Sequence, residues 1–365
     1  MKKTTFTVIV SLIIIIVLIS ALWVINSSRT KTNNHSIKVG VILPLSGPAA
    51  FSGLQAQKGL DLAIAEINQQ NQNQIELIYQ DSKANPEQSV TAFNNLINLH
   101  DSDVIISSLS SVSMAIAPLA QEKQIPLIAT IATTPDLTKQ NQWTYRYYPI
   151  ADQEIPPLVS VANELKLNKI AVLHLNDDFG LSMKNTLAEK FKGEVISQSF
   201  AISDQDFKSA LTKLKTQDPD GLLVVGFSSH IINGFKQAQE LGVKVTYFAP
   251  SSAAFADIRK SINEIGIEVY AGIPQVYGEK EIPKIKEIKK QIDNFDHYVA
   301  TGYDLGHLIK QVSNNSKGLK QEIKNNLDNL ENFNGILGSV LLNNHELNFP
   351  LDKALIKNGE IKYLK

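Results

Sequence analysis

The sequence of 365 residues contains no cysteine. Disulfide bonds, cysteine nucleophiles and cysteine-ligated metals are therefore excluded. An excess of charge of either sign is also lacking, because 35 Lys and Arg residues and 36 Asp and Glu residues leave a net charge of -1. Proteins that bind nucleic acids usually carry a basic stripe on their surface. The near balance of charge therefore argues against a nucleic-acid partner.

Common enzyme motifs are missing as well. The chain has no G-x-G-x-x-G after its first predicted strand, no G-x-x-x-x-G-K-[ST] loop, no H-E-x-x-H and no G-x-S-x-G. His297 and His307 fall on different faces of a predicted helix, which does not favour a metal pair. We therefore expect a binding protein that is not an enzyme and that needs no cofactor or metal.

Apolar residues, in contrast, are abundant. Hydrophobic residues make up 43% of the sequence and charged residues 19%, so the chain can bury substantial cores. Its length exceeds that of one ordinary domain, and two lobes are the natural expectation.

One long hydrophobic run stands at the N-terminus. Residues 6–25 are almost entirely apolar and follow Lys2 and Lys3, which predicts a segment that enters the membrane with its positive end inside. We assign residues 1–29 to a signal or anchor segment and 30–36 to a linker, and place the rest outside the cytoplasm. No A-x-A site follows the run. We favour an uncleaved anchor, with cleavage near Ser27 as the alternative.

From residue 37 onward, strand-like and helix-like patterns alternate. Helical patterns such as those of residues 113–124 and 231–241 separate the strands. Two such series in succession predict an α/β protein with two doubly wound lobes, each built on a parallel sheet. The predicted strands are 37–43, 75–79, 104–106 and 126–128 in the first series, and 170–175, 195–200, 222–225 and 243–248 in the second.

Two helix starts carry recognisable caps. Ser52 and Gln55 have the spacing of a capping box. Asn85 is followed by Pro86 and, three residues after the cap, by Gln88, which predicts a helix that begins at the proline.

Ligands of open α/β sheets bind outside the carboxyl ends of the strands. The loops at those ends are rich in Ser, Thr and Gly and carry few charges, which suits hydrogen bonding to a small ligand. These loops are 44–53, 107–113, 129–136, 176–180, 226–230 and 250–254.

A series of short segments then identifies a family. They are 37–40, 44–48, Asp81 with Pro86, 110–111, 132–138, Arg146 with Asp152, 206–207, 219–220, 237–242, and Tyr303 with Asp304. In this order they resemble the leucine/isoleucine/valine-binding family of transporter solute receptors, which has the type I periplasmic-binding fold. The resemblance covers nearly all of residues 37–365.

The resemblance implies how the lobes are assembled. Residues 37–149 and about 275–335 would form the first lobe, and about 150–274 with about 336–365 the second, joined by three crossover strands. In this family a ligand carboxylate is held by hydroxyl groups and backbone N–H groups. By analogy, Ser110 and Thr133, with Ser111 beside them, would hold the carboxylate, and the Ile131 carbonyl would face an amino group. The walls would be formed by Ser52, Phe179, Phe227 or Ser228, Ser251 and Tyr303.

One departure from the family concerns charge. Amino-acid binders of the family carry a glutamate in the loop where this chain has Ser251. An ammonium group enclosed without a negative partner is strongly unfavourable. The sequence therefore favours a carboxylate, an amide or a urea-like ligand over an ordinary amino acid, unless Asp177, Asp178 or Asp257 reaches the site from another loop.

The resemblance also implies a function. We expect a solute-binding protein in the periplasm or, anchored by residues 6–25, on the extracytoplasmic face of the bacterial inner membrane. It would close its lobes on a small polar metabolite that is amino-acid-like, a carboxylate or an amide, and deliver it to an ABC permease. The alternative is a membrane-tethered sensory ectodomain.

Overall fold

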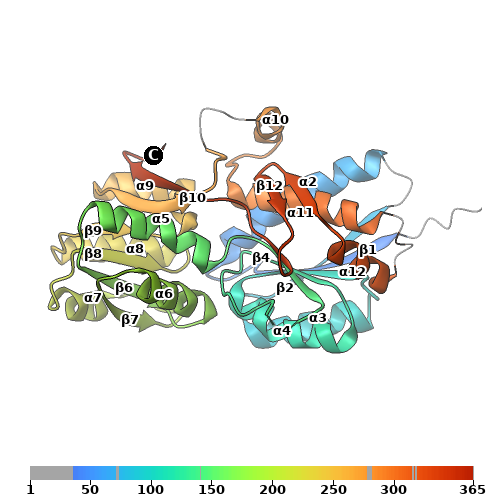
Figure 1. Cartoon of the computed structure of the whole chain (residues 1–365), viewed down its shortest axis with the longest axis horizontal. Coiled ribbons are helices and arrows are strands. Elements are labelled where there is room, and N and C mark those ends of the chain that lie inside the picture. Colours follow the sequence, from blue (N-terminus) through green and yellow to red (C-terminus); the bar gives the residue numbers. More distant parts are fainter. Residues whose placement is uncertain are drawn as a thin grey trace, which may run out of the picture.

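The computed structural model describes residues 36–70, 74–139, 141–277, 282–314, 316 and 319–364. Two α/β lobes lie side by side in Figure 1, and the predicted fold is confirmed. Within the described residues, no helix is both long and apolar enough to cross a membrane. The apolar run 6–25 lies outside the described residues, so the anchor stays a prediction.

The first lobe is built on a six-stranded sheet in which every neighbouring pair is parallel. Helices α3 (Pro86–Asn98) and α4 (Ser110–Lys123) pack below it in Figure 1, and α2 (Ala50–Gln70) and α11 (His297–Ser313) above it. The strand order is β13 (Glu346–Leu347), β5 (Thr144–Tyr147), β4 (Leu127–Thr130), β3 (Val104–Ser108), β1 (Ile37–Leu43) and β2 (Ile75–Asp81).

The second lobe is built on a seven-stranded sheet. Its neighbouring strands are parallel, except that β14 is antiparallel to both β10 and β15. Alternate residues of β6 face opposite sides of this sheet. Ile170 and Val172 share one apolar core with α5 (Ala151–Glu164) and α6 (Asp178–Lys190). Ala171 and Leu173 belong to the apolar core on the opposite side. The order is β15 (Glu360–Tyr363), β14 (Asp352–Lys357), β10 (Val269–Ile273), β9 (Thr246–Phe248), β8 (Gly221–Val225), β6 (Lys169–Leu175) and β7 (Glu194–Phe200).

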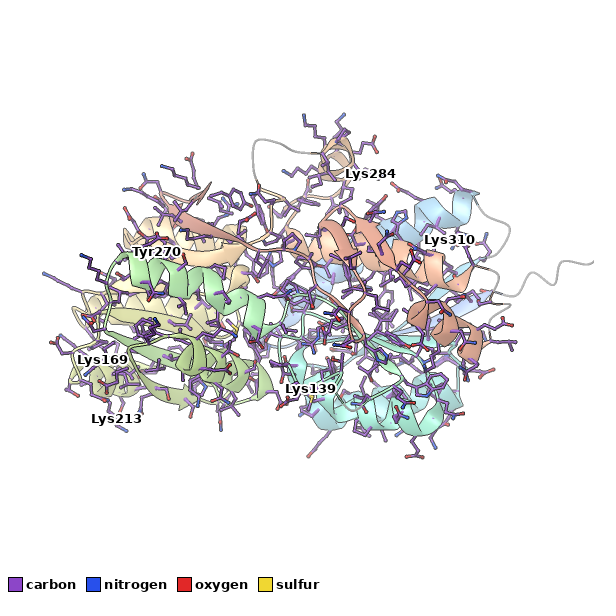
Figure 2. All side chains as sticks on the ribbon, in the orientation of Figure 1. Lys139, Lys169, Lys213, Tyr270, Lys284 and Lys310 are labelled. Atoms are coloured by element: carbon purple, nitrogen blue, oxygen red, sulfur yellow. The ribbon has the colours of Figure 1, made fainter. Side chains whose placement is uncertain are left out.

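The remaining elements complete both lobes. Helices α7 (Lys208–Lys215), α8 (Ser228–Glu240) and α9 (Ala256–Ile265) belong to the second lobe, as does the short 3-10 helix η1 (Ser251–Ala254). Helix α12 (Lys320–Asp328) and the hairpin of β11 (Asn332–Gly335) and β12 (Gly338–Leu341) belong to the first. Helix α10 (Pro283–Gln291) stands at the edge of the molecule, where Lys284, labelled in Figure 2, pairs with Glu66 of α2 at 3.0 Å.

In the described residues, the chain passes from one lobe to the other after β5, after β10 and after β13, and the separate two-stranded sheet of β11 and β12 lies between the last two of these changes. The third change comes later than the predicted boundary at about 336, because β13 still pairs with β5. The physical reason lies in α11, where the buried Asp304 carboxylate accepts hydrogen bonds from the backbone N–H groups of Ile336 (2.7 Å) and Leu337 (3.0 Å). These bonds hold the hairpin on the first lobe.

The two predicted helix starts have different outcomes. Asn85 caps α3 as predicted, accepting a 2.9 Å bond from the Gln88 N–H. The predicted capping box at Ser52 is wrong, because α2 begins at Ala50 and the Ser52 hydroxyl donates to the Ala49 carbonyl (2.8 Å).

Helices α2 and α11 cross in close contact. A Cβ atom on Gly59 would lie 1.9 Å from the Val299 carbonyl oxygen, and one on Gly302 would lie 1.9 Å from the Ala56 carbonyl oxygen. The two glycines therefore allow the backbones to touch, and this contact fixes the place of the N-terminal turns of both helices at the interlobe site.

Candidate functional site: a pocket between the lobes

A pocket of about 620 Å³, including its opening to solvent, lies between the two lobes. Each of the six loops singled out in the sequence contributes at least one residue to its lining. We call it the interlobe pocket. The carboxyl ends of both parallel sheets therefore converge on one cavity, as expected for ligand sites of this fold class.

Eight of the predicted site residues line the interlobe pocket, and two do not. Those in the lining are Ser52, Ser110, Ile131, Thr133, Phe179, Phe227, Ser228 and Ser251.

Ser111, expected beside the carboxylate, and Tyr303, expected in a wall, are not among the lining residues. The Tyr303 hydroxyl donates instead to Glu66 at 2.7 Å, and its ring contacts His307. The wall position on α11 belongs to Tyr298. Five residues along a helix correspond to a rotation of about 140°, so the two tyrosines cannot share a face.

The loop after β4 is held rigidly from behind. Arg146, fully buried on β5, donates through Nη1 to the carbonyl oxygens of Ala132 (2.7 Å) and Thr134 (2.8 Å). Its charge is balanced by Glu346 at 3.0 Å. Ile131 has a φ of 49°, an unusual value for a β-branched residue. The buried guanidinium thus maintains a strained loop next to the pocket.

The hydroxyl of Ser110 joins this loop to the start of α4. Its oxygen accepts the backbone N–H groups of Thr133 (3.0 Å) and Thr134 (3.4 Å), which leaves the hydroxyl proton available as a donor. The N-cap residue Leu109 provides no side-chain cap, so the first N–H groups of α4 have no such partner. Together with the positive end of the helix dipole, these donors suit an anion.

Aromatic rings from both lobes enclose the pocket. Phe51 on α2 lies 5.0 Å, centroid to centroid, from Phe255 of the second lobe. Phe255 in turn packs on Tyr298 at 4.5 Å. The hydroxyls of Thr133 and Ser182, also from opposite lobes, are 3.4 Å apart. The lobes therefore meet over the pocket and are arranged in a closed form.

Sequence reasoning missed Glu154, an acid in the first turn of α5. Its side chain lines the pocket, and the residue is only 2% exposed. Its two carboxylate oxygens accept hydrogen bonds from Ser251, one from the backbone N–H (2.9 Å) and one from the hydroxyl (3.0 Å). Burial raises the pKa of Glu154 to about 7, although the two hydrogen bonds from Ser251 lower it.

Asp177 is the second acid of the lining, and the sequence had identified it as a possible one. Its carboxylate caps α6 by accepting the Gly180 N–H at 2.9 Å, and burial raises its pKa to about 6. None of the described lining residues is Lys, Arg or His. Two carboxylates therefore reach the pocket from elements other than the loop after β9, and Asp177 is one of the acids for which the sequence analysis left this open.

The chain matches a family model. The model describes periplasmic binding proteins and matches residues 36–345. The chain therefore belongs to the periplasmic binding protein family. The family assignment made from the sequence segments is confirmed at this level.

A curated relative is the Leu/Ile/Val-binding protein homolog 2 of Brucella abortus (strain 2308), 31% identical over 193 residues. The match covers 50% of this chain and 52% of the relative, so the chain spans about half the length of that protein.

Two solved structures show the same fold. The branched-chain amino acid transporter substrate binding protein LivJ of Streptococcus pneumoniae, in complex with isoleucine, is 24% identical, with a TM-score of 0.78 over 90% of this chain and 98% of that chain. A solute binding protein of an ABC transporter of Rhodopseudomonas palustris, in complex with 3,4-dihydroxy benzoic acid, is 21% identical, with a TM-score of 0.78 over 90% and 96%. The family model and the curated relative are both described as binding proteins, which supports a solute-binding role.

Proposed function

We propose that this protein captures a small polar solute between its lobes outside the cytoplasm and delivers it to an ABC permease. The observation that carries the proposal is the interlobe pocket, which is lined by loops from both sheets and covered by the Phe51–Phe255 contact. Opening and closing about the segments that connect the lobes would admit and release the solute.

A carboxylate of the solute would bind at the start of α4. The Ser110 hydroxyl retains its proton for a ligand, and Thr133 stands beside it in the lining. Charge-assisted hydrogen bonds from such donors are stronger than neutral ones. The two solved relatives support this assignment, since isoleucine and 3,4-dihydroxy benzoic acid both carry a carboxylate.

The second candidate is a membrane-tethered sensory ectodomain. The observation that favours it is the apolar run 6–25, because a carrier benefits from free diffusion and a sensor does not need it. Both candidates place the globular part outside the cytoplasm and share the same pocket.

Native mass spectrometry of the full chain, released from mild detergent, tests the capture of a solute. We expect a bound small molecule that is lost on denaturation. Cross-linking in membranes then separates the two candidates, because a carrier contacts a permease and a sensor contacts a signalling protein. A chain that is free of any solute and binds none in a thermal-shift screen of metabolites would contradict the proposal.

A further inference from the structure

Glu154 is a buried acid whose charge nothing in the described lining balances. Its carboxylate forms no ion pair among the described residues, and both recorded hydrogen bonds come from the neutral residue Ser251. A carboxylate removed from water without a cation is strongly destabilising. A replacement of similar shape without charge would fold more stably, so the acid is best explained by a ligand that supplies the cation.

The surroundings of Glu154 are organised towards the pocket. Ser251 holds both carboxylate oxygens in place, and its hydroxyl is 3.4 Å from that of Tyr148, which also lines the cavity. Next to it, the Ser252 hydroxyl is buried in the lining at 7% exposure and has no hydrogen-bond partner. A buried hydroxyl without a partner is unfavourable. Ser252 is therefore a second group in this wall that a ligand would satisfy.

We propose that Glu154 determines the class of solute by binding a positively charged nitrogen, so that the pocket selects a zwitterion with an apolar group over a simple carboxylate. The inference rests on the proposed function. The anion would lie at the start of α4 beside Ser110, the cation would lie at Glu154, and the apolar group would contact Phe51 and Phe179. The negative charge that binds the cation would thus come from α5, and Ser251 would hold the carboxylate in position.

The selectivity has a simple electrostatic origin. An ammonium group facing Glu154 forms a charge-assisted hydrogen bond, whereas a solute without it leaves the carboxylate buried and unpaired. We expect an amino acid to bind at least about 10-fold more tightly than the carboxylic acid that lacks its amino group, and the difference can reach about 100-fold.

Calorimetry on the full chain tests the inference with matched pairs of probes. The pairs are leucine with 4-methylpentanoate and phenylalanine with 3-phenylpropanoate. Wild type should prefer the amino acid of a pair, and Glu154→Gln should lose that preference. Glu164→Gln, at the exposed end of the same helix, is the control and should retain it. Restoring the charge nearby, in Glu154→Gln with Ser251→Glu, should recover amino-acid binding.

The outcomes separate this inference from the proposed function. Equal affinity of wild type for both members of a pair, or a preference that survives Glu154→Gln, overturns the role of Glu154. A native mass spectrum with a bound solute that has no basic nitrogen overturns it as well, while the capture function stands. If no probe binds at 1 mM, the inference that the pocket selects an apolar zwitterion is overturned, and the mass spectrum alone decides on capture.

Discussion

Glu154→Gln is expected to stabilise the ligand-free protein at alkaline pH. Burial raises the pKa of Glu154 from the ordinary value of 4.5 to about 7. The folded protein therefore binds this proton more tightly than the unfolded chain. The contribution of Glu154 to stability is complete below about pH 4.5 and is lost as the pH rises through about 7. Each pKa unit corresponds to about 1.4 kcal/mol, so ionised Glu154 costs about 3 kcal/mol at pH 8.

A glutamine avoids this cost and retains the local contacts. Its carbonyl oxygen can accept the Ser251 N–H, and its amide can donate to the Ser251 hydroxyl, which are the groups that Glu154 contacts. The other titratable groups near Glu154 are Tyr148 and Tyr298, whose pKa values are raised by burial, and both stay neutral up to pH 8. Asp177 titrates in both proteins and cancels in the comparison.

Urea unfolding at pH 5 and pH 8 measures the effect. We expect the free energies of unfolding of wild type and Glu154→Gln to be similar at pH 5, and the variant to be more stable by up to about 3 kcal/mol at pH 8. A saturating native solute should reduce or reverse this advantage at pH 8, because it binds the folded wild type. A variant that is no more stable than wild type at pH 8 would show that a cation outside the described residues, or solvent, already compensates the carboxylate.

Three further predictions follow from other parts of the structure. Ser110→Ala should weaken binding of the native solute about 10-fold to 100-fold in calorimetry, because it removes a charge-assisted hydrogen bond, and an unchanged affinity would place the anion elsewhere. Gly302→Ala should destabilise the protein by at least about 2 kcal/mol in thermal or urea unfolding, since its Cβ would overlap the Ala56 carbonyl. Gly266→Ala is the control, because the space around its Cβ is open and the substitution tests backbone strain alone. An export-dependent reporter fused after Lys365 should be active if residues 6–25 carry the chain out of the cytoplasm, and an inactive fusion contradicts that topology.

The fold could be predicted because its signals are local. The run 37–43 was predicted as a strand and is β1, and Asn85 with Pro86 fixed the start of α3. The hydrophobic periodicity of an element and the capping of a helix depend on residues only a few positions apart, so a single sequence is enough to predict them. The alternation of such elements then limited the architecture to parallel sheets, and the carboxyl ends of their strands indicated the six loops of the pocket.

Contacts between residues that are far apart in the sequence were harder to predict. The boundary at about 336 depended on Asp304, which binds the backbone of Ile336 and Leu337 more than 30 residues later. The exchange of Tyr303 for Tyr298 depended on which face of α11 meets the second lobe. Both the boundary and the wall tyrosine depend on tertiary packing. The local sequence pattern of an apolar helix does not indicate which of its faces meets the second lobe.

The error over the acid has a different cause, and it bears on the ligand. The absence of a glutamate at Ser251 favoured a ligand without an ammonium group, and the acids considered as substitutes were Asp177, Asp178 and Asp257 but not Glu154. A bound ammonium, however, responds to the position of a carboxylate in the cavity and not to the element that provides it. Glu154 reaches the same wall from α5 and is held there by Ser251 itself. The serine that argued against an amino acid is thus the residue that positions the acid, and the preference for a solute without an ammonium group loses its physical basis.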